Sequence, residues 1–252
     1  MVMSKTGMGT PHSPAEVADV AEQEARTGTS FLHRYRWRLL LLFVGLLLPL
    51  WMFAELGDEV READAFFFDE PILHLARGMA HEGFDRVFLL FSHIGYQYGV
   101  VPFDIALVIA LAWKRRFRES IFAAVAAGGS AVLNIAAKHS FARERPSLWE
   151  SISPETTFSF PSAHAMGSMT IAVVVMLLAW HTRWRWIAVA TMSAFVVMVG
   201  LSRVYLGVHY PSDILAGWAA ASVWVVGVYG LMFYGHLRPW QLRGEGKPPD
   251  PP

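Results

Sequence analysis

Three short motifs gather the residues of this chain that can do chemistry. They read K-x6-R-P, P-S-A-H and S-R-x5-H-x3-D, and they follow one another between residues 138 and 213. Their side chains are three cations, two imidazoles, two serines and one carboxylate: Lys138, Arg145, Arg203, His164, His209, Ser162, Ser202 and Asp213. Charged groups are costly in an apolar protein unless they serve a site. This set is what handling a phosphoryl group requires, so the sequence predicts a reaction.

The three cations can form a receptor for a dianion. Lys138 is expected at the end of one apolar helix, Arg145 in the loop that follows, and Arg203 at the end of another apolar helix. Arginines offer a phosphate bidentate contacts that a lysine cannot. Any one of these cations alone is explained as well by pairing with lipid headgroups. The three together favour the receptor.

The second motif directly precedes an apolar segment, where Ser162 is a natural helix N-cap. Pro161 disfavours a helical residue before it. The free N–H groups and the positive dipole end of such a helix suit a bound phosphate. His164, in the first turn, can donate a proton to a leaving oxygen. Taken alone, the motif is an ordinary helix cap.

His209 and Asp213 stand four residues apart, on either side of Pro211. A carboxylate one turn away can hold one ring nitrogen protonated and leave the other free to attack phosphorus. One alternative is a buried histidine that a neighbour satisfies. A second is a metal site made of His164, His209 and Asp213, which the adjoining arginines oppose because they repel a cation.

The composition is that of a membrane protein. The 252 residues are 54% hydrophobic and 17% charged, with a mean hydropathy of +0.35, whereas a soluble domain has about 25% charged residues. The formal net charge of zero argues against a general nucleic-acid partner. The absence of cysteine excludes disulfides and thiolate metal sites.

Six segments are apolar enough to cross about 30 Å of hydrocarbon. They are approximately Leu39 to Ala54, Tyr98 to Trp113, Ser120 to Ala137, Ala165 to Trp180, Trp186 to Leu206 and Ile214 to Tyr234. We therefore expect an all-α bundle of six transmembrane helices over residues 34–237, between tails at 1–33 and 238–252. Phe84 to Ile94 is expected as an interfacial helix. Asp104 is expected to face the bundle and be hydrogen-bonded there, although a part in the mechanism is the alternative.

The loops give an orientation. Basic residues precede the first span and recur in every second loop, and the positive-inside rule makes that side cytoplasmic. Both termini are then cytoplasmic, and all three motifs lie at the outer face, as expected for a bacterial cytoplasmic membrane. Four cations contradict the rule by lying on the outer side: Lys138, Arg143, Arg145 and Arg203. We expect them to have a specific role.

The three motifs resemble the signature of the type 2 phosphatidic acid phosphatase (PAP2) superfamily, which includes vanadium haloperoxidases and bacterial acid phosphatases. The resemblance implies that His209 is the nucleophile, that Asp213 orients it and that His164 is the general acid. It also implies that Lys138, Arg145, Ser162 and Arg203 bind the phosphoryl oxygens, without a metal or cofactor. The family usually has glycine at Ala163, whose backbone N–H is retained here. Ser202 matches the motif, but its role is the least defined.

The expected function is removal of phosphate from a membrane lipid, with undecaprenyl diphosphate, phosphatidylglycerophosphate and phosphatidic acid as candidates. A lipid-linked phosphotransferase would use the same site. A haloperoxidase shares the residues but does not fit the spans. A transporter should show inverted repeats, and none is visible, while a non-catalytic scaffold should have lost a charged motif residue, and none is missing. The sequence does not predict the oligomeric state.

Overall fold

The structure, a computed structural model, describes residues 39–40, 42–62, 66–233 and 239–240. Residues 1–43 and 44–252 form two separate compact units. The tail expected at residues 1–33 lies outside the described residues. All three motifs lie in the second unit.

The described residues form helices joined by turns and loops, with no strand among them, so the all-α prediction is confirmed. In chain order the helices are η1 (Phe43–Leu47), α2 (Leu48–Glu62), α3 (Asp69–Gly78), α4 (Glu82–Ile94), α5 (Val100–Trp113), α6 (Phe117–Phe141), α7 (Ala163–Ala179), α8 (Arg185–Tyr205) and α9 (Pro211–Met232). The helix expected at Phe84 to Ile94 is present as α4. Each of the six apolar segments coincides with a helix of the described chain.

Three helices of the described chain, α6, α8 and α9, are long and apolar enough to cross a membrane. The apolar helices α5 and α7 are shorter. The first expected span differs most, because its helix continues past Ala54 through the charged residues up to Glu62. Hydropathy indicates contact with lipid, whereas a helix continues wherever its backbone is paired, so the two boundaries need not coincide.

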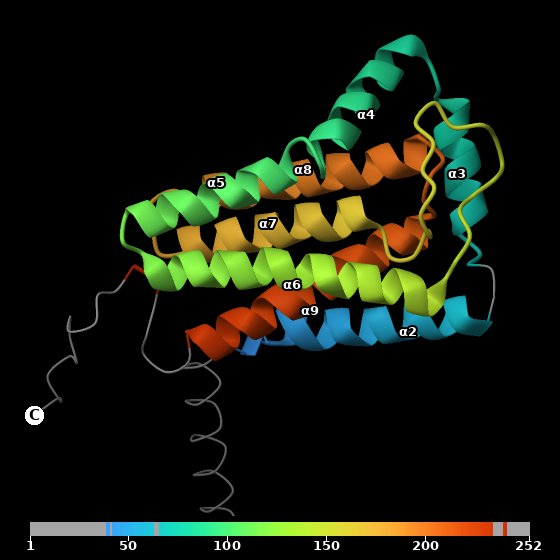
Figure 1. Cartoon of the computed structure of the whole chain (residues 1–252). Helices are drawn as coiled ribbons and strands as arrows, with labels where there is room; N and C mark the ends of the chain where they lie inside the picture. Colours follow the sequence, from blue (N-terminus) through green and yellow to red (C-terminus); the bar gives the residue numbers. More distant parts are fainter. Residues whose placement is uncertain (1–38, 41, 63–65, 234–238, 241–252) are drawn as a thin grey trace, which may run out of the picture. The chain divides into compact units, whose positions relative to one another are not determined.

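Helix α7 lies at the centre of the second unit and packs against α6, α8 and α9 (Figure 1). Its contact with α9 is close at Gly217, where an added Cβ would lie 2.9 Å from the carbonyl oxygen of Ser162. Small residues let apolar helices approach in this way. The beginning of α7 therefore lies against the first turns of α9, which brings the second motif to the third.

Aromatic and branched side chains fill the half of the bundle that lies away from the three motifs. Phe122, Val174 and Val225 are buried in one cluster that joins α6, α7 and α9. At this end the side chain of Trp240 donates a hydrogen bond to the Leu178 carbonyl at 2.7 Å. The backbone N–H of Trp240 donates to Glu119 Oε1 at 2.6 Å. This part of the expected C-terminal tail is thus hydrogen-bonded to the bundle.

The connections lie at two opposite ends of the bundle. The α5–α6 turn is at one end, and the long α6–α7 loop is at the other, beside α3 (Figure 1). The long loop carries Arg145 and ends at Ser162, and the α8–α9 connection carries His209. The chain alternates between the two ends, so the chemistry of the three motifs falls at one of them.

Candidate active site

His209 lies in the short connection between α8 and α9 and is fully buried. Its Nδ1 is 3.3 Å from Oδ2 of Asp213. That oxygen also accepts the backbone N–H of Tyr210 at 2.9 Å and the hydroxyl of Ser159. A carboxylate that accepts this many hydrogen bonds is ionised, so Nδ1 of His209 carries the proton and Nε2 has the free lone pair.

His209 is a neutral imidazole, as a nucleophile must be. Burial, together with the positive charges of Arg145 and Arg203, lowers the pKa of His209 well below its usual value. Arg145 Nη1 lies 3.1 Å from Nε2. An arginine only donates, so Nε2 is the acceptor in this contact. The reactive nitrogen of a neutral imidazole therefore faces the cations that would hold a phosphate.

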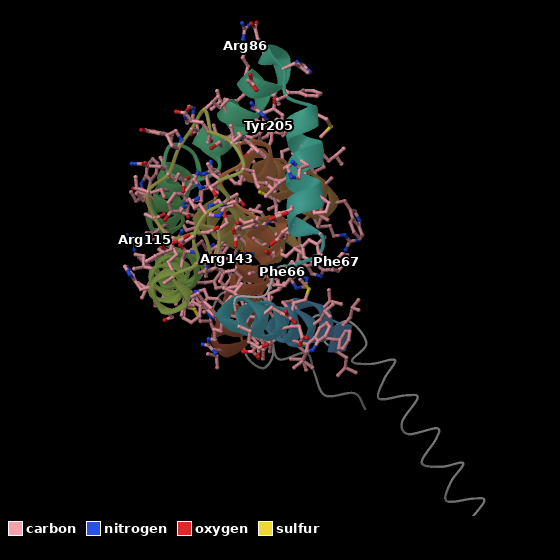
Figure 2. The ribbon with its side chains drawn as sticks, turned by 90° about the vertical axis from the view of Figure 1, so that its right-hand side faces the viewer. Phe66, Phe67, Arg86, Arg115, Arg143 and Tyr205 are labelled. Carbon is pink, nitrogen blue, oxygen red and sulfur yellow. The ribbon has the colours of Figure 1, made fainter. Side chains whose placement is uncertain are left out.

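A second arginine, Arg143, holds Asp213 from the other side. Its Nη1 donates to Asp213 Oδ1 at 2.6 Å, and its Nη2 lies 3.0 Å from Oδ2 of Asp69. Asp69 in turn accepts the backbone N–H of Ser212 at 2.9 Å. The guanidinium also lies over the Tyr210 ring at 4.2 Å. It lies over the Phe66 ring as well, at 5.5 Å, and Figure 2 labels Phe66 and Arg143. Arg143 and Asp69 thus fix the carboxylate that orients His209.

The cations of the first motif meet in the loop between α6 and α7. The Lys138 ammonium donates to the Thr157 hydroxyl at 3.3 Å and to the carbonyl of Phe158. Arg145 Nη2 donates to the same two oxygens, at 3.0 Å and 3.3 Å. The two side chains therefore share their partners and lie side by side.

Arg203 joins this group from the last turn of α8 and is 1% exposed. Its Nη1 donates to the hydroxyl of Ser92 in α4. Its Nη2 donates to Glu155, whose other carboxylate oxygen accepts from Arg145 at 2.6 Å. The three motif cations thus meet around one point, which lies next to Nε2 of His209.

The beginning of α7 completes the site. Ser162 is the N-cap of α7, as the sequence predicts, and its hydroxyl accepts the N–H of Ala165 at 3.4 Å. Its own N–H donates to the Asp213 carbonyl at 3.1 Å. Ala163 is the first helical residue, so its N–H has no partner within the helix. That N–H is a donor for a bound anion.

His164 follows in the first turn, and its ring packs against Tyr96 at 5.3 Å between centroids. Its Nδ1 makes no hydrogen bond to any described residue and lies 3.7 Å from a carboxylate oxygen of Glu155. The free nitrogen thus faces the point where the cations meet. A proton carried there would lie across the cationic centre from His209.

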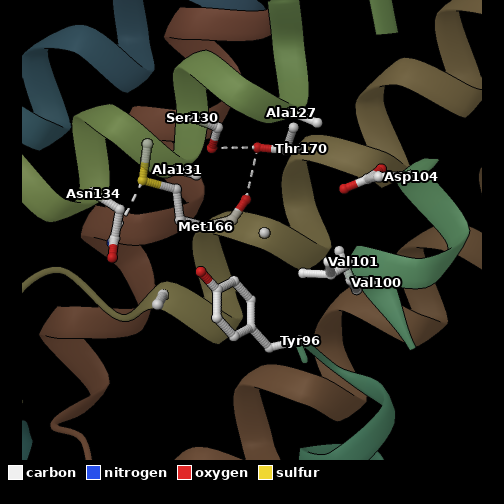
Figure 3. A pocket seen from close by; sticks show the side chains of 12 residues that line it. Tyr96, Val100, Val101, Asp104, Ala127, Ser130, Ala131, Asn134, Met166 and Thr170 are labelled. Carbon is white, nitrogen blue, oxygen red and sulfur yellow. Dashed lines mark hydrogen bonds between the residues drawn. The ribbon is translucent and has the colours of Figure 1, made fainter. Parts of the chain in front are cut away.

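Two residues singled out from the sequence lie differently. The Ser202 hydroxyl is buried and donates to the Val199 carbonyl in its own helix at 2.6 Å, so a part in phosphate binding stays a prediction. Asp104 points into a cavity of about 60 Å³ between α5, α6 and α7, together with Tyr96 and Thr170 (Figure 3). Its carboxylate makes no hydrogen bond to the described residues, so the expected bonding partner is not seen.

Three residues of the site were missed from the sequence. Asp69 is an ordinary member of an acidic stretch, Glu155 is a single glutamate between Pro154 and Thr156, and Ser159 is one of many loop serines. Arg143 did give a signal, since it is a cation on the side where the positive-inside rule expects few. No group of three or more His, Cys, Asp or Glu side chains in the described chain is placed to hold a metal ion.

Known proteins resemble this chain over the region that contains the three motifs. The PAP2 superfamily model matches residues 119–237, which contain all three motifs. The chain is 30% identical over 196 residues to an undecaprenyl-diphosphatase of Sulfolobus acidocaldarius, covering 76% of this chain and 87% of the relative. It is 26% identical over 159 residues to phosphatidylglycerophosphatase B of Bacillus subtilis, covering 60% of this chain and 76% of the relative.

A solved structure shares the fold. The crystal structure of a transmembrane PAP2-type phosphatidylglycerolphosphate phosphatase from Bacillus subtilis superimposes with a TM-score of 0.64 at 24% identity. The match covers 73% of this chain and 94% of that one. The arrangement of helices described above is therefore shared with a membrane phosphatase.

Proposed function

This chain belongs to the PAP2 superfamily and is a membrane lipid phosphatase of that type, and we propose that it works through a phosphohistidine formed on His209 at the outer membrane face. The observation that carries this proposal is the position of Nε2 of His209. That nitrogen is unprotonated and 3.1 Å from Arg145, at the edge of the point where the three motif cations meet. A phosphoryl group bound there would present its phosphorus to the nitrogen.

The first half of the reaction transfers the phosphoryl group to the protein. Nε2 of His209 attacks phosphorus, the P–N bond forms and the bond to the lipid oxygen breaks. His164 gives its proton to that oxygen, so the lipid departs as a neutral alcohol or as a protonated phosphate. The imidazole gains positive charge as the P–N bond forms, and Asp213 stabilises it through Nδ1.

The second half releases inorganic phosphate. A water attacks phosphorus and gives a proton to His164, and the P–N bond breaks with its electron pair returning to His209. Both histidines are then in their starting states. Lys138, Arg145, Arg203 and the N–H groups at the start of α7 stabilise the equatorial oxygens in both steps, which is the main contribution that a protein makes to phosphoryl transfer.

The basic loops support the orientation of the site. The α5–α6 connection carries Lys114, Arg115 and Arg116, at the end of the bundle away from the motifs. Loops rich in lysine and arginine face the cytoplasm. We therefore place the site at the outer face of the cytoplasmic membrane, with both termini inside.

The substrate we propose first is undecaprenyl diphosphate, because a relative that carries that activity in its name matches most of both chains. Phosphatidylglycerophosphate is the second candidate, since another relative bears its name. Phosphatidic acid is the third. All three present a terminal phosphate that lies at the level of the lipid headgroups.

The proposal is tested by phosphate release from these three lipids with the purified full chain in mixed micelles, in the presence of chelator. We expect release from at least one lipid and none above background for His209→Ala. His93→Ala is the control, because the His93 side chain is exposed on α4 and its ring contacts Tyr98, outside the three motifs. Brief reaction with ³²P-labelled lipid should leave acid-labile label on the wild-type protein. Activity that survives in His209→Ala would refute the proposal.

A further inference from the structure

An anion of the chain itself occupies the point where the motif cations meet. Glu155 lies in the α6–α7 loop, and its two carboxylate oxygens accept from Nη2 of Arg145, at 2.6 Å, and from Nη2 of Arg203. One of these oxygens is also 3.7 Å from the free Nδ1 of His164. Glu155 therefore contacts three of the groups that the proposed mechanism gives to the phosphoryl group.

The carboxylate is charged in this position. Burial alone would raise the pKa of Glu155, but the surrounding positive charges, Arg203 foremost and then Arg145 and Lys138, hold it below its usual value. A carboxylate and a phosphate both offer a pair of oxygens to an arginine. The contacts of Glu155 thus resemble those that a phosphoryl group would make.

Both arginines have partners besides Glu155. Arg145 donates through Nε to the Thr157 carbonyl and through Nη1 to the Val208 carbonyl, each at 2.6 Å. Its Nη2, which faces Glu155, also donates to the Thr157 hydroxyl at 3.0 Å. Arg203 donates through Nη1 to the Ser92 hydroxyl, while its Nη2 faces Glu155 and its Nε has no hydrogen-bond partner in the described chain. If the carboxylate withdrew, Arg145 would keep its other contacts, and the donors left free for an anion would lie mainly on Arg203.

Glu155 also has room to withdraw. Its side chain is 26% exposed, whereas that of Arg203 is 1% exposed. The glutamate therefore lies at the solvent side of the cluster, in a loop without regular secondary structure.

We propose that Glu155 is a displaceable occupant of the phosphoryl site, which a substrate phosphate expels on binding and which returns to the arginines as inorganic phosphate leaves. The inference rests on the proposed function for the identity of the anion. It makes Glu155 a determinant of affinity in a site that otherwise consists of cations and hydrogen-bond donors.

The physical consequence is a uniform reduction in affinity for anions. When only a fraction of the protein is free to bind, the apparent Kd rises by the inverse of that fraction. If the site is open for about 1–10% of the time, every anion binds roughly 10- to 100-fold more weakly than to a site without Glu155. A phosphodiester headgroup carries one negative charge and is attracted to the cations less strongly than a terminal phosphate with two. The same reduction therefore lowers an affinity that is already weaker.

The test is a calorimetric titration of the purified full chain in detergent at pH 8, first with inorganic phosphate and then with diethyl phosphate. We expect Glu155→Gln to bind both anions about 10-fold tighter or more. Glu155→Asp keeps the charge but is one methylene shorter, so it should also bind phosphate more tightly than the wild type. The control is Glu150→Gln, which removes the same charge from an exposed position in the same loop; we expect its Kd values within about twofold of wild type.

The sign of the change decides the question. If Glu155 instead held the arginines in place for the substrate, Glu155→Gln would weaken phosphate binding. An unchanged or raised Kd for either anion, or an equal gain in Glu150→Gln, would overturn the inference. Thermal unfolding of each variant checks that it is folded, and Glu155→Ala replaces any variant that is not. Because no turnover is needed, the titration remains informative even if none of the three lipids is hydrolysed.

Discussion

Replacement of Asp213 by asparagine tests whether its carboxylate orients His209 or only holds the fold together. The residue is fully buried, and one oxygen accepts from Arg143 at 2.6 Å while the other faces Nδ1 of His209 at 3.3 Å. Asparagine has nearly the same shape, so it leaves no cavity. Its amide must, however, place an NH₂ group against one of these two donors. If it faces His209, it forces the proton onto Nε2, the nitrogen that must attack.

The expected loss of activity is large. In serine proteases, replacing the buried aspartate that orients the catalytic histidine by asparagine lowers kcat about 10⁴-fold. We expect a fall of about 10³- to 10⁴-fold for Asp213→Asn, which corresponds to roughly 4–5.5 kcal/mol in the activation barrier. The stability loss should be smaller, about 1.5–3 kcal/mol for one hydrogen bond to a charged group.

Asp69→Asn is the matched control. Asp69 is also buried and also contacts Arg143, at 3.0 Å, but its hydrogen-bond partners in the described chain are Arg143 and Ser212 and do not include His209. Both variants remove one negative charge from the same arginine and leave it the other carboxylate. We expect similar losses of stability from the two, by thermal unfolding in detergent, but at most about a tenfold loss of activity for Asp69→Asn. Phosphate release from short-chain phosphatidic acid provides the rate. Equal losses of activity in the two variants would refute the role given to Asp213.

Three further predictions follow from the geometry of the site. Since His209 must be neutral to attack and its pKa is lowered, the acid limb of kcat/KM should lie below the ordinary histidine range; a pH profile corrected for substrate ionisation that shows the limb at or above pH 6.5 would contradict this. Gly207→Ala should lose about 1–3 kcal/mol of stability or more, because φ is +68° and the new Cβ would lie 2.5 Å from the Trp149 ring. Gly227→Ala, with open space around it, should unfold like the wild type. Arg145→Lys should lower kcat/KM by roughly 10- to 100-fold, because lysine cannot reproduce the fork of contacts; steady-state kinetics that match the wild type would argue against a phosphate contact.

The membrane helices could be predicted because their signal is local. Runs of apolar residues such as Ile214 to Tyr234 exceed what a soluble core requires, and α9 is found there. The boundaries were less predictable, as the continuation of α2 to Glu62 shows. Charged residues end an apolar window but do not end a helix.

The site was predictable to the extent that its residues are joined by motif spacing. His209 and Asp213 are four residues apart at the beginning of a helix, and the structure brings their side chains together. Contacts between distant segments carry no such signal. Asp69 meets Arg143 from 74 residues away, and nothing near Asp69 in the sequence distinguishes it from its acidic neighbours. For Ser202, spacing gives the position but not the direction of the hydroxyl, which bonds to its own helix instead.

The distribution of carboxylates explains why Arg143 is not expected among the phosphate ligands, although it lies close to them. Its two terminal nitrogens are occupied by Asp69 and Asp213, at 3.0 Å and 2.6 Å. An arginine that faces two carboxylates has no surplus positive charge for a substrate. If a substrate displaced either carboxylate, the negative charge of that carboxylate would lose its partner in a site with little water, which is costly. Arg143 therefore acts on the reaction through the histidine that its partner orients.

The other cations have the opposite balance. Arg145 and Arg203 share the single carboxylate of Glu155, and Lys138 donates to a hydroxyl and a carbonyl oxygen. Three positive charges face one negative charge, which leaves a surplus of two. When Glu155 withdraws, a phosphate dianion meets the three cations and leaves a surplus of one, so the site comes closer to neutrality. A carboxylate can therefore occupy the site in the absence of substrate and still be displaced by a terminal phosphate. The phosphate dianion carries twice the charge of the carboxylate, so the cations attract it more strongly.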